Sequence, residues 1–551
     1  MSTTRRIVIV GGVAAGMSAA TRLRRLDETA SITVIERGAE VSCATCGMPY
    51  HLGGVISDRE ALTLQTPERL RARFALDVRV RTEVVEIDRA ARAIVLHGPD
   101  GVERLDYDEL VLATGAAAVR PGIPGDERAH VLRSTTDLDA IMAALADHPQ
   151  RAVVLGGGYV GLEVAENLRA RGMEVAVVQR GPQLLTGFDP EMAEPVARAA
   201  RDAGVALHLG TEAVAIDEDA VRLADGSVLP AELVIAALGV RPESWLARRA
   251  GLELGASGGV LVDEQFRSSD PAIRAVGDVA EKTDAVLGGT RSLPLAGPAN
   301  LHGRLVADAL AGHRVVAPAS IGVAIVQAFG VTAATAGASE ARLRAAGRPH
   351  RVIHTHPLHH AGYYPGAVPL SLKLLVDLVD DRILGAQAVG REGVDRRIDV
   401  LATAMRGGIP ASGLAELELA YAPQFGSAKD PVNMLGYVAD NRRTGERAIQ
   451  WHELDAALAD GARLVDVRAA GQLAEGLIPG AEWIPVEQLR DRVDELRGTR
   501  VIVHCRVGQG AHTAASLLAA HGIDVVNLDG GYLTWRDGHA ARALTGEPAL
   551  A

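Results

Sequence analysis

The chain has 551 residues, of which 48% are apolar and 23% charged, and its formal net charge is −12. It is too long for one hydrophobic core, so we expect three or four domains of a globular protein. The negative charge and the aromatic content of only 3% disfavour nucleic-acid binding and binding to anionic membranes. No apolar run reaches the ~18 residues that cross a bilayer, which predicts a cytoplasmic protein without a membrane partner.

The first elements form a strand, a glycine-rich turn, a helix and a second strand. They occupy residues 7–10, 11–16, 17–26 and 32–35, and the second strand ends at Glu36. Glycine in this turn lets backbone N–H groups approach a pyrophosphate, and the Glu36 carboxylate is placed to bond ribose hydroxyls. Val13 replaces the middle glycine of the dinucleotide motif, so a plain βαβ turn stays open. The predicted cofactor contacts are Gly11, Gly12, Ala15, Gly16, Glu36 and Arg37.

Two of the three cysteines follow this unit, in the segment Ser42-Cys43-Ala44-Thr45-Cys46-Gly47-Met48-Pro49-Tyr50. The third, Cys505, lies near the other end of the chain. So few cysteines do not form a disulfide framework. Because each lies in a loop with the pattern of a site, the sequence favours sulfur chemistry.

A second strand–turn–helix–strand unit begins at residue 152. Its turn has glycine at all three motif positions, Gly156, Gly158 and Gly161, and its second strand, residues 175–178, is followed by Gln179 and Arg180. A neutral residue with a neighbouring arginine favours the 2′-phosphate of NADPH, where a carboxylate would repel it. NADH stays possible, as does a purely solvated role for Arg180.

Three further apolar segments, at residues 110–115, 233–239 and 273–278, end in small or acidic residues. The order of these segments and the two nucleotide units resembles the FAD-dependent pyridine nucleotide–disulfide oxidoreductases over residues 5 to about 440. The resemblance implies FAD in the first unit and NADPH or NADH in the second. Asp278 would hold a ribityl hydroxyl of the flavin. The further predicted cofactor contacts are Thr114, Gly115, Gly277 and Asp278.

Within that family, the coenzyme A-disulfide reductases, NADH oxidases and persulfide reductases carry one cysteine in Ser-Phe-x-x-Cys-Gly-x-Pro-Tyr. The resemblance places this cysteine at Cys46 and implies coenzyme A contacts at Ser42, Thr45 and Arg22. We expect backbone N–H groups and a helix dipole to favour the Cys46 thiolate, which can attack a disulfide or persulfide sulfur. Cys43 replaces the family phenylalanine, and either resolves a disulfide with Cys46 or is a small packing residue.

Segments 360–366 and 420–425 resemble the two tyrosine segments of coenzyme A-disulfide reductases. In that family they belong to the dimerisation domain and reach the active site of the partner subunit. The resemblance implies a homodimer in which Tyr363 and Tyr421 bond the substrate or the cysteine sulfur. Ordinary packing residues near Pro-Gly turns are the alternative.

The βα pattern restarts after the polar segment 441–447, and residues 451–551 resemble a rhodanese domain. The resemblance implies that the loop after Cys505 surrounds its sulfur with N–H groups and stabilises a persulfide. Gly510 stands where the family often has arginine, which puts thiosulfate binding in doubt, and Arg506 is the candidate replacement. The predicted loop is Cys505, Arg506, Val507, Gly508, Gln509, Gly510 and Ala511.

These patterns predict an α/β protein with two Rossmann-like dinucleotide-binding domains, an α+β dimerisation domain and a C-terminal α/β rhodanese domain. The expected boundaries are 1–115 and 246–320 for the FAD-binding domain, 116–245 for the NAD(P)H-binding domain, 321–440 for the dimerisation domain, 441–450 for a linker and 451–551 for the rhodanese domain.

The predicted activity is NAD(P)H-dependent reduction of coenzyme A disulfide, coenzyme A persulfide or polysulfide through Cys46, with Cys505 carrying sulfane sulfur. Two alternatives stay open. One is an NADH oxidase or peroxidase that cycles through a Cys46 sulfenic acid, and the other is a Cys43–Cys46 dithiol reductase. Histidines at 354, 356, 359 and 360 lack cysteine or acid partners at a plausible spacing, so we expect no metal site.

Overall fold

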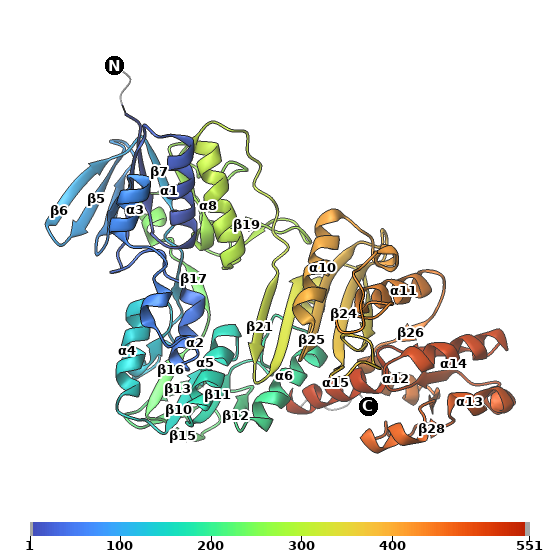
Figure 1. Cartoon of the computed structure of the whole chain (residues 1–551). Coiled ribbons are helices and arrows are strands. Elements are labelled where there is room, and N and C mark those ends of the chain that lie inside the picture. The colour runs from blue at the N-terminus through green and yellow to red at the C-terminus, as the bar shows by residue number, and fades with distance from the viewer. Residues whose placement is uncertain (1–3, 546–551) are drawn as a thin grey trace. The chain divides into compact units, whose positions relative to one another are not determined.

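The computed structural model describes residues 4–545, so the first and last expected domains begin and end outside the described residues. The chain forms two compact units (Figure 1). One contains the chain up to Val178 together with Thr211–Gly322, and the other contains Gln179–Gly210 together with the chain from Val323 onward. Both are α/β, as the sequence predicts. Among residues 4–545, no helix has the length and apolar character required to cross a membrane.

The first unit begins with a five-stranded parallel sheet in the order β18-β7-β1-β2-β3. Alternate residues of β1 enter different cores, with Ile7 and Ile9 on one face and Val8 and Val10 on the other. Helices α1 and α8 pack side by side over the first of these faces (Figure 1). Burial on both faces explains the uninterrupted apolar run in the sequence. The bounds are β1 Arg6–Val10, β2 Ser31–Ile35, β3 Asp77–Arg79, β7 Glu109–Leu112, β18 Ile273–Ala275, α1 Ala14–Leu26 and α8 Ala296–Leu310.

Helix α1 begins three residues earlier than the sequence predicts. The N–H of Met17 already donates to the carbonyl of Val13 at 3.0 Å, so the turn before the helix is only three residues long. Strands β1 and β2 begin one residue earlier than predicted and end at the predicted residues.

A second parallel sheet of the first unit contains β11, β10, β16 and β9 in that order. Helix α5 follows β10 and packs against it, as expected for a nucleotide-binding βαβ unit. The bounds are β9 His130–Val131, β10 Arg151–Leu155, β11 Glu174–Gln179, β16 Leu233–Ala236, α4 Thr135–Leu145 and α5 Tyr159–Ala170.

Smaller elements complete the first unit. Two antiparallel three-stranded sheets, β4-β5-β6 and β13-β14-β15, and the antiparallel pairs β8–β17 and β19–β20 are separate from the two parallel sheets. The bounds are β4 Glu83–Asp88, β5 Ala93–Gly98, β6 Gly101–Asp106, β8 Ala116–Ala118, β13 Ala213–Ile216, β14 Ala220–Leu223, β15 Val228–Pro230, β17 Val240–Pro242, β19 Lys282–Thr283, β20 Thr290–Arg291, α2 Met48–Leu52, α3 Pro67–Phe74 and α7 Trp245–Arg249.

The second unit contains a five-stranded antiparallel sheet in the order β21-β22-β25-β24-β23. Helices α6 and α10 pack on β22 and β25, and α11 packs on β23. The bounds are β12 Ala206–Leu209, β21 Ala324–Ala328, β22 Val331–Gly337, β23 His350–Thr355, β24 Leu370–Asp377, β25 Ile383–Gly390, α6 Pro190–Asp202, α9 Glu340–Ala345, α10 Val394–Gly407 and α11 Pro431–Arg443.

The C-terminal part of this unit is a parallel sheet in the order β26-β30-β29-β27-β28, with α14 against β29 and β30. Helix α15 packs along α6, which lies more than 300 residues earlier in the chain (Figure 1). The bounds are β26 Ala448–Ile449, β27 Arg463–Asp466, β28 Glu482–Trp483, β29 Val501–His504, β30 Val525–Leu528, α12 Leu454–Ala459, α13 Val486–Leu489, α14 Gln509–Ala520 and α15 Gly531–Thr545.

The segment expected to be a polar linker, residues 441–450, is largely structured. Helix α11 continues to Arg443, and β26 already pairs with β30 of the C-terminal sheet. The side chain of Arg442 is only 5% exposed, because it bonds Asp529 inside the second unit. The charge of Arg442 predicts an exposed side chain, but in the structure the buried partner Asp529 explains how this charge is accommodated inside the protein.

Candidate active sites

The first glycine turn is shaped for a close ligand approach. Gly11 has φ +110°, and a Cβ there would collide with the carbonyl oxygen of Ala113, while a Cβ on Gly16 would collide with the carbonyl oxygen of Gly11. The Glu36 carboxylate accepts the N–H of Gly12 at 2.8 Å and the N–H of Gly38 at 2.7 Å. The structure therefore brings Glu36 to the turn, as the motif predicts.

Asp278 lies just after the end of β18, beside helix α1. Gly277 has φ +77°, and an added Cβ would lie 2.9 Å from Cβ of Ala15, so the strand end packs directly on α1. One oxygen of Asp278 accepts from Arg133 Nη2 at 3.3 Å, and the other is buried without a hydrogen-bond partner among the described residues. An unpartnered buried acceptor fits a hydroxyl group of a bound cofactor, so these residues fit FAD.

Thr114 and Arg37 meet at Glu243. The Thr114 hydroxyl donates to the Glu243 carbonyl at 2.8 Å, and the Arg37 guanidinium pairs with the Glu243 carboxylate at 3.3 Å. The N–H of Glu243 donates to the carbonyl of Gly115 at 2.9 Å, and Gly115 has φ +73°. These predicted residues therefore cluster at the carboxyl ends of β2 and β7.

Cys46 and Cys43 have different surroundings. Cys46 is exposed on a 3₁₀ turn at Thr45–Gly47, immediately before α2. Cys43 forms an antiparallel bridge with Thr63, and its thiol donates to a Glu40 oxygen at 3.7 Å. Burial and the Glu40 charge raise the pKa of Cys43 to about 11, so its thiol stays protonated at neutral pH.

Ser42 has the left-handed backbone conformation, with φ +55°, which turns the chain into this segment. The Ser42 N–H donates to the Gly12 carbonyl at 2.8 Å, so the cysteine segment is attached to the nucleotide turn. Thr45 lies one residue before Cys46. Arg22, the predicted phosphate contact, pairs with Asp308 of α8 at 2.8 Å.

The helix after Cys46 contacts the second nucleotide fold. The Tyr50 hydroxyl donates to a Glu163 oxygen of α5 at 3.1 Å. Burial and the Glu163 charge raise the pKa of Tyr50 to about 12, and burial raises the pKa of Glu163. The sequence did not predict this contact. Tyr50 stood out only as part of the cysteine segment, and Glu163 only as the residue two positions after the third glycine, Gly161.

The second glycine turn repeats the geometry of the first. Gly156 has φ +110°, and a Cβ added there would collide with the carbonyl oxygen of Ala237. A Cβ added to Gly161 would collide with the carbonyl oxygen of Gly156. Gly158 faces open space, which leaves room for a ligand. Gln179 and Arg180 belong to the second unit, and Arg180 is exposed.

The two predicted tyrosines meet although 58 residues separate them. The hydroxyls of Tyr363 and Tyr421 lie 2.8 Å apart, and the residues are 76% and 46% exposed. The hydrogen bond to Tyr421 raises the pKa of Tyr363. Two exposed phenols joined by one hydrogen bond leave donors and acceptors for a further group.

Cys505 lies in a backbone cradle at the end of β29. The residue is 6% exposed, and its sulfur accepts the N–H of Gly508, which has φ +91°, at 3.2 Å. A Cβ added to Gly510 would lie 3.5 Å from the sulfur, so glycine leaves that side of the sulfur open. The Arg506 Nε donates to both oxygens of Glu475 at 2.8 Å, so its guanidinium is engaged by that carboxylate. Val507 and Gln509 complete the loop, and Ala511 is buried in α14.

Three buried carboxylates, Asp189, Glu191 and Glu340, lie close enough in the described part of the chain to hold a cation. The ammonium of Lys373 already lies among them, at 2.9, 2.5 and 2.7 Å, and is only 1% exposed. Lys373 therefore occupies the place among the carboxylates that a metal ion would take, and its charge offsets part of theirs. The charge pattern gave no sign of this in the sequence, because Glu340 in α9 and Lys373 in β24 are far along the chain from Asp189 and Glu191 at the start of α6.

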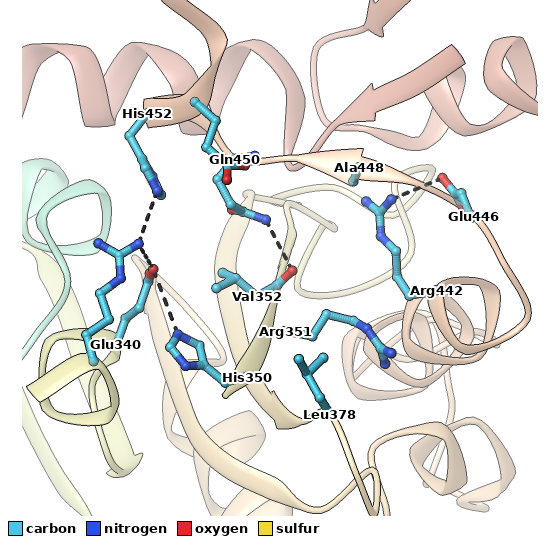
Figure 2. Close-up of a pocket in the computed structure, with 12 residues that line it drawn as sticks. Glu340, His350, Arg351, Val352, Leu378, Arg442, Glu446, Ala448, Gln450 and His452 are labelled. Atoms are coloured by element: carbon cyan, nitrogen blue, oxygen red, sulfur yellow. Dashed lines mark hydrogen bonds and ion pairs between the residues drawn. The ribbon is translucent and has the colours of Figure 1, made fainter. Parts of the chain in front are cut away.

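A polar pocket of about 420 Å³ opens between α9, β23, the end of α11 and β26 (Figure 2). None of the predicted site residues lines it. Its acids are paired within the protein, since Glu340 bonds Lys373 and Arg344, and Glu446 bonds His512 at 2.8 Å. Arg442 at its wall contacts Glu446 at 3.8 Å.

Two glycine turns that each begin a βαβ unit, a buried acid at the end of β18 and an exposed cysteine are the features expected of a flavin-dependent disulfide reductase. The sequence matches the pyridine nucleotide-disulphide oxidoreductase family over residues 5–303, more than half of the chain. It also matches the dimerisation domain of that family over residues 323–431 and a rhodanese-like domain over residues 450–537.

The chain belongs to the pyridine nucleotide-disulphide oxidoreductase family, and it is an FAD- and NAD(P)H-dependent oxidoreductase with a C-terminal rhodanese domain. It is 33% identical to the coenzyme A disulfide reductase of Staphylococcus aureus (strain JH9) over 438 residues, 79% of this chain and 99% of the relative.

Two solved structures are similar over nearly the whole chain. Reduced Bacillus anthracis CoADR-RHD superposes with a TM-score of 0.96 and 41% identity, covering 98% of this chain and 99% of that one. An NAD-dependent persulfide reductase from A. fulgidus superposes with a TM-score of 0.90 and 36% identity, covering 96% of this chain and 100% of that one.

Proposed function

We propose that the protein reduces coenzyme A disulfide, coenzyme A persulfide or polysulfide with NAD(P)H through Cys46, and that Cys505 carries sulfane sulfur. The difference between Cys46 and Cys43 carries the proposal. Only Cys46 is exposed, and the pKa of Cys43 is raised to about 11. One reactive thiol is what a single-cysteine reductase requires, and a Cys43–Cys46 dithiol enzyme would need both.

The relatives named above support the substrate class. The Staphylococcus aureus relative is named a coenzyme A disulfide reductase, and the A. fulgidus protein is named a persulfide reductase. The family match over residues 5–303 includes the cysteine segment, in which Cys46 stands at the family cysteine and Cys43 and Thr45 depart from the family pattern. We infer that coenzyme A binds against this segment. Arg22 reaches a phosphate only by exchanging its ion pair with Asp308.

In the proposed reaction, the Cys46 thiolate attacks one sulfur of coenzyme A disulfide. A Cys46–S–S–CoA bond forms, and the other coenzyme A leaves as a thiolate. With coenzyme A persulfide, attack at the inner sulfur forms the same mixed disulfide and releases hydrosulfide. Bound FAD supplies the two electrons of NAD(P)H that cleave the mixed disulfide to coenzyme A thiolate and Cys46 thiolate. Gln179 and Arg180 favour NADPH as the electron donor.

The proposed partner of this chain is a second copy of itself. The match to the dimerisation domain and the exposed pair Tyr363 and Tyr421 support it. A phenol of the pair would donate a hydrogen bond to the departing sulfur. The phenol would thereby act as the proton donor for the thiolate leaving group.

Cys505 would accept a sulfane sulfur from a donor, so that Cys505–S⁻ becomes Cys505–S–S⁻ and the donor leaves as a thiolate. The N–H of Gly508 already bonds the sulfur and would also stabilise the negative charge of a persulfide. An acceptor thiolate then takes the outer sulfur and restores the Cys505 thiolate.

The test is anaerobic oxidation of NADPH and NADH by the FAD-loaded protein, with coenzyme A disulfide and coenzyme A persulfide as acceptors. Cys46→Ser is expected to lower the rate by about a thousandfold or more, whereas Cys43→Ser is expected to stay within about threefold. Equal losses in both variants would identify a dithiol reductase. Turnover that requires oxygen would identify an oxidase, in which Cys46 cycles through a sulfenic acid.

A further inference from the structure

Asp529 joins the rhodanese domain to the antiparallel sheet of the second unit. One of its oxygens accepts the backbone N–H of His354 at 2.8 Å and the ring Nδ1 of His354 at 2.7 Å. The other accepts Nη2 of Arg442 at 3.1 Å. Asp529 and His354 are 2% and 3% exposed, so these bonds form away from water.

His354 contributes a positive charge to this contact. Its second ring nitrogen, Nε2, faces a Glu191 oxygen of α6 at 3.0 Å. Since both ring nitrogens face carboxylate oxygens, both donate protons, which requires the imidazolium form. Burial and Lys373 lower the pKa of His354, but the bonds to Asp529 and Glu191 outweigh them and raise it to about 9.

Asp529 begins the turn against which the Cys505 loop packs. A Cβ on the next residue, Gly530, would lie 2.7 Å from Cβ of His354, so His354 contacts the turn directly. Gly531 has φ +63°, and a Cβ there would collide with the Cys505 carbonyl oxygen and lie 2.9 Å from the Gly508 nitrogen. The N–H that bonds the Cys505 sulfur therefore lies in contact with the turn.

Backbone hydrogen bonds fix the loop to the same turn. The N–H of Tyr532 donates to the Cys505 carbonyl at 2.8 Å, and the N–H of Leu533 donates to the Arg506 carbonyl at 3.1 Å. A displacement of Asp529 would thus move the atoms that orient the sulfur and its N–H donor.

We propose that His354 is a positioning residue for Cys505, because through Asp529 it fixes the turn that supports the reactive loop. A rhodanese domain therefore depends on a side chain outside its own residues 450–537. The role rests on the proposed sulfur carriage by Cys505. It extends that proposal by assigning a function to the contact between the two domains of the second unit.

A second contact of the same interface provides the matched control. Asp537 of α15 is buried and pairs with Arg198 of α6 at 2.8 Å. It joins the rhodanese domain to α6, and within the described part of the chain its side chain bonds Arg198 and Arg536 rather than the Cys505 loop. Asp529→Asn and Asp537→Asn therefore both remove a buried carboxylate that pairs across this interface, and of the two carboxylates Asp529 is the one in the turn beneath the loop.

The experiment uses the full-length, FAD-loaded protein and the variants His354→Gln, Asp529→Asn, their double variant and the control Asp537→Asn. Amide hydrogen exchange of a peptide covering residues 505–512 reports on the loop itself. Sulfur transfer from glutathione persulfide to cyanide reports on its function. In that reaction Cys505 gains the outer sulfur, glutathione leaves as a thiolate, and cyanide removes the sulfur as thiocyanate.

We expect exchange in residues 505–512 to become about tenfold faster in His354→Gln and Asp529→Asn, and unchanged in Asp537→Asn. The kcat of sulfur transfer is expected to fall about tenfold with a donor KM within about twofold. The double variant should lose no more than either single one, because the two residues act through the same bond. Reduction of coenzyme A disulfide should continue at the wild-type rate in all variants.

Wild-type exchange in both single variants would overturn the positioning role, and so would an equal acceleration in Asp537→Asn. If the wild-type protein transfers no sulfur, the proposed function of Cys505 fails by itself. The exchange measurement then still decides whether His354 holds the loop.

Discussion

The Cys46 side chain is exposed on a short 3₁₀ turn, whereas Cys505 is 6% exposed and lies under the N–H of Gly508. The surroundings of the two sulfurs also differ. Three residues before Cys46 in the sequence is Cys43, a thiol kept protonated by burial and by Glu40. Beside Cys505 is a glycine turn that is held by side chains of another domain.

This difference agrees with the size of the proposed substrates. A coenzyme A disulfide is large, so the attacking sulfur must be reachable from solvent. A persulfide adds one atom to the cysteine, and an enclosed backbone cradle protects it and neutralises its charge. One chain can therefore contain two sulfur centres that differ in accessibility and in the group that stabilises the anion.

The largest expected effect separates the two centres. Cys505→Ser should abolish sulfur transfer from glutathione persulfide to cyanide, with a loss of about a thousandfold or more, because the attacking atom is gone. Coenzyme A disulfide reduction should continue in the same preparation. The measurement is the steady-state rate of each reaction in the wild type and in Cys505→Ser. A loss of the reductase rate that parallels the loss of sulfur transfer would show that the two centres are not independent.

A smaller loss is expected from the tyrosine pair. Tyr421→Phe removes one hydroxyl of the 2.8 Å bond to Tyr363. If the pair donates a proton to the departing thiolate, kcat for coenzyme A disulfide should fall about a hundredfold, since general acids contribute factors of this order. The exposed Tyr437→Phe is the control. A wild-type rate in Tyr421→Phe would assign the pair to packing.

The turn under Cys505 should resist substitution. Gly531→Ala places a Cβ against the Cys505 carbonyl at φ +63° and should lower the free energy of unfolding of the rhodanese domain by about 3 kcal/mol. Gly522 has a similar φ of +76° but open space around it, so Gly522→Ala should cost only about 1 kcal/mol. Thermal melting followed by tryptophan fluorescence compares them, because Trp451, Trp483 and Trp535 lie in this domain. Equal losses would mean that the close packing is not required.

The smallest expected effect concerns Cys43. Its raised pKa predicts slow alkylation by iodoacetamide at pH 8 and a rate that increases as the pH approaches about 11. Mass spectrometry of the peptide around residue 43, in a Cys46→Ser background, follows the modification. Replacement of Glu40 by Gln removes the negative charge next to the thiol and should lower the pH at which alkylation accelerates. Fast alkylation at pH 7 would restore Cys43 as a candidate thiolate.

Much of the architecture could be predicted from sequence because its signals are local. The apolar runs before Gly11 and Gly156 each predict a buried parallel strand. Each strand is followed by a glycine turn that has no room for side chains. The tyrosine pair and the Cys505 loop were predicted from family resemblance, and the structure brings Tyr363 and Tyr421 together. The beginning of α1 was misplaced by three residues, since Val13 and the following alanines carry no capping signal.

The sequence by itself determined the two glycine turns, because short-range steric rules encode them, and its resemblance to a known family predicted the role of the cysteine segment and the C-terminal rhodanese domain. Only the tertiary structure decided that Cys43 is held protonated, that Arg442 is buried and that His354 reaches Asp529 175 residues away. Protonation and charge pairing depend on which groups surround a side chain in space. Those groups come from distant elements, so no local pattern records them.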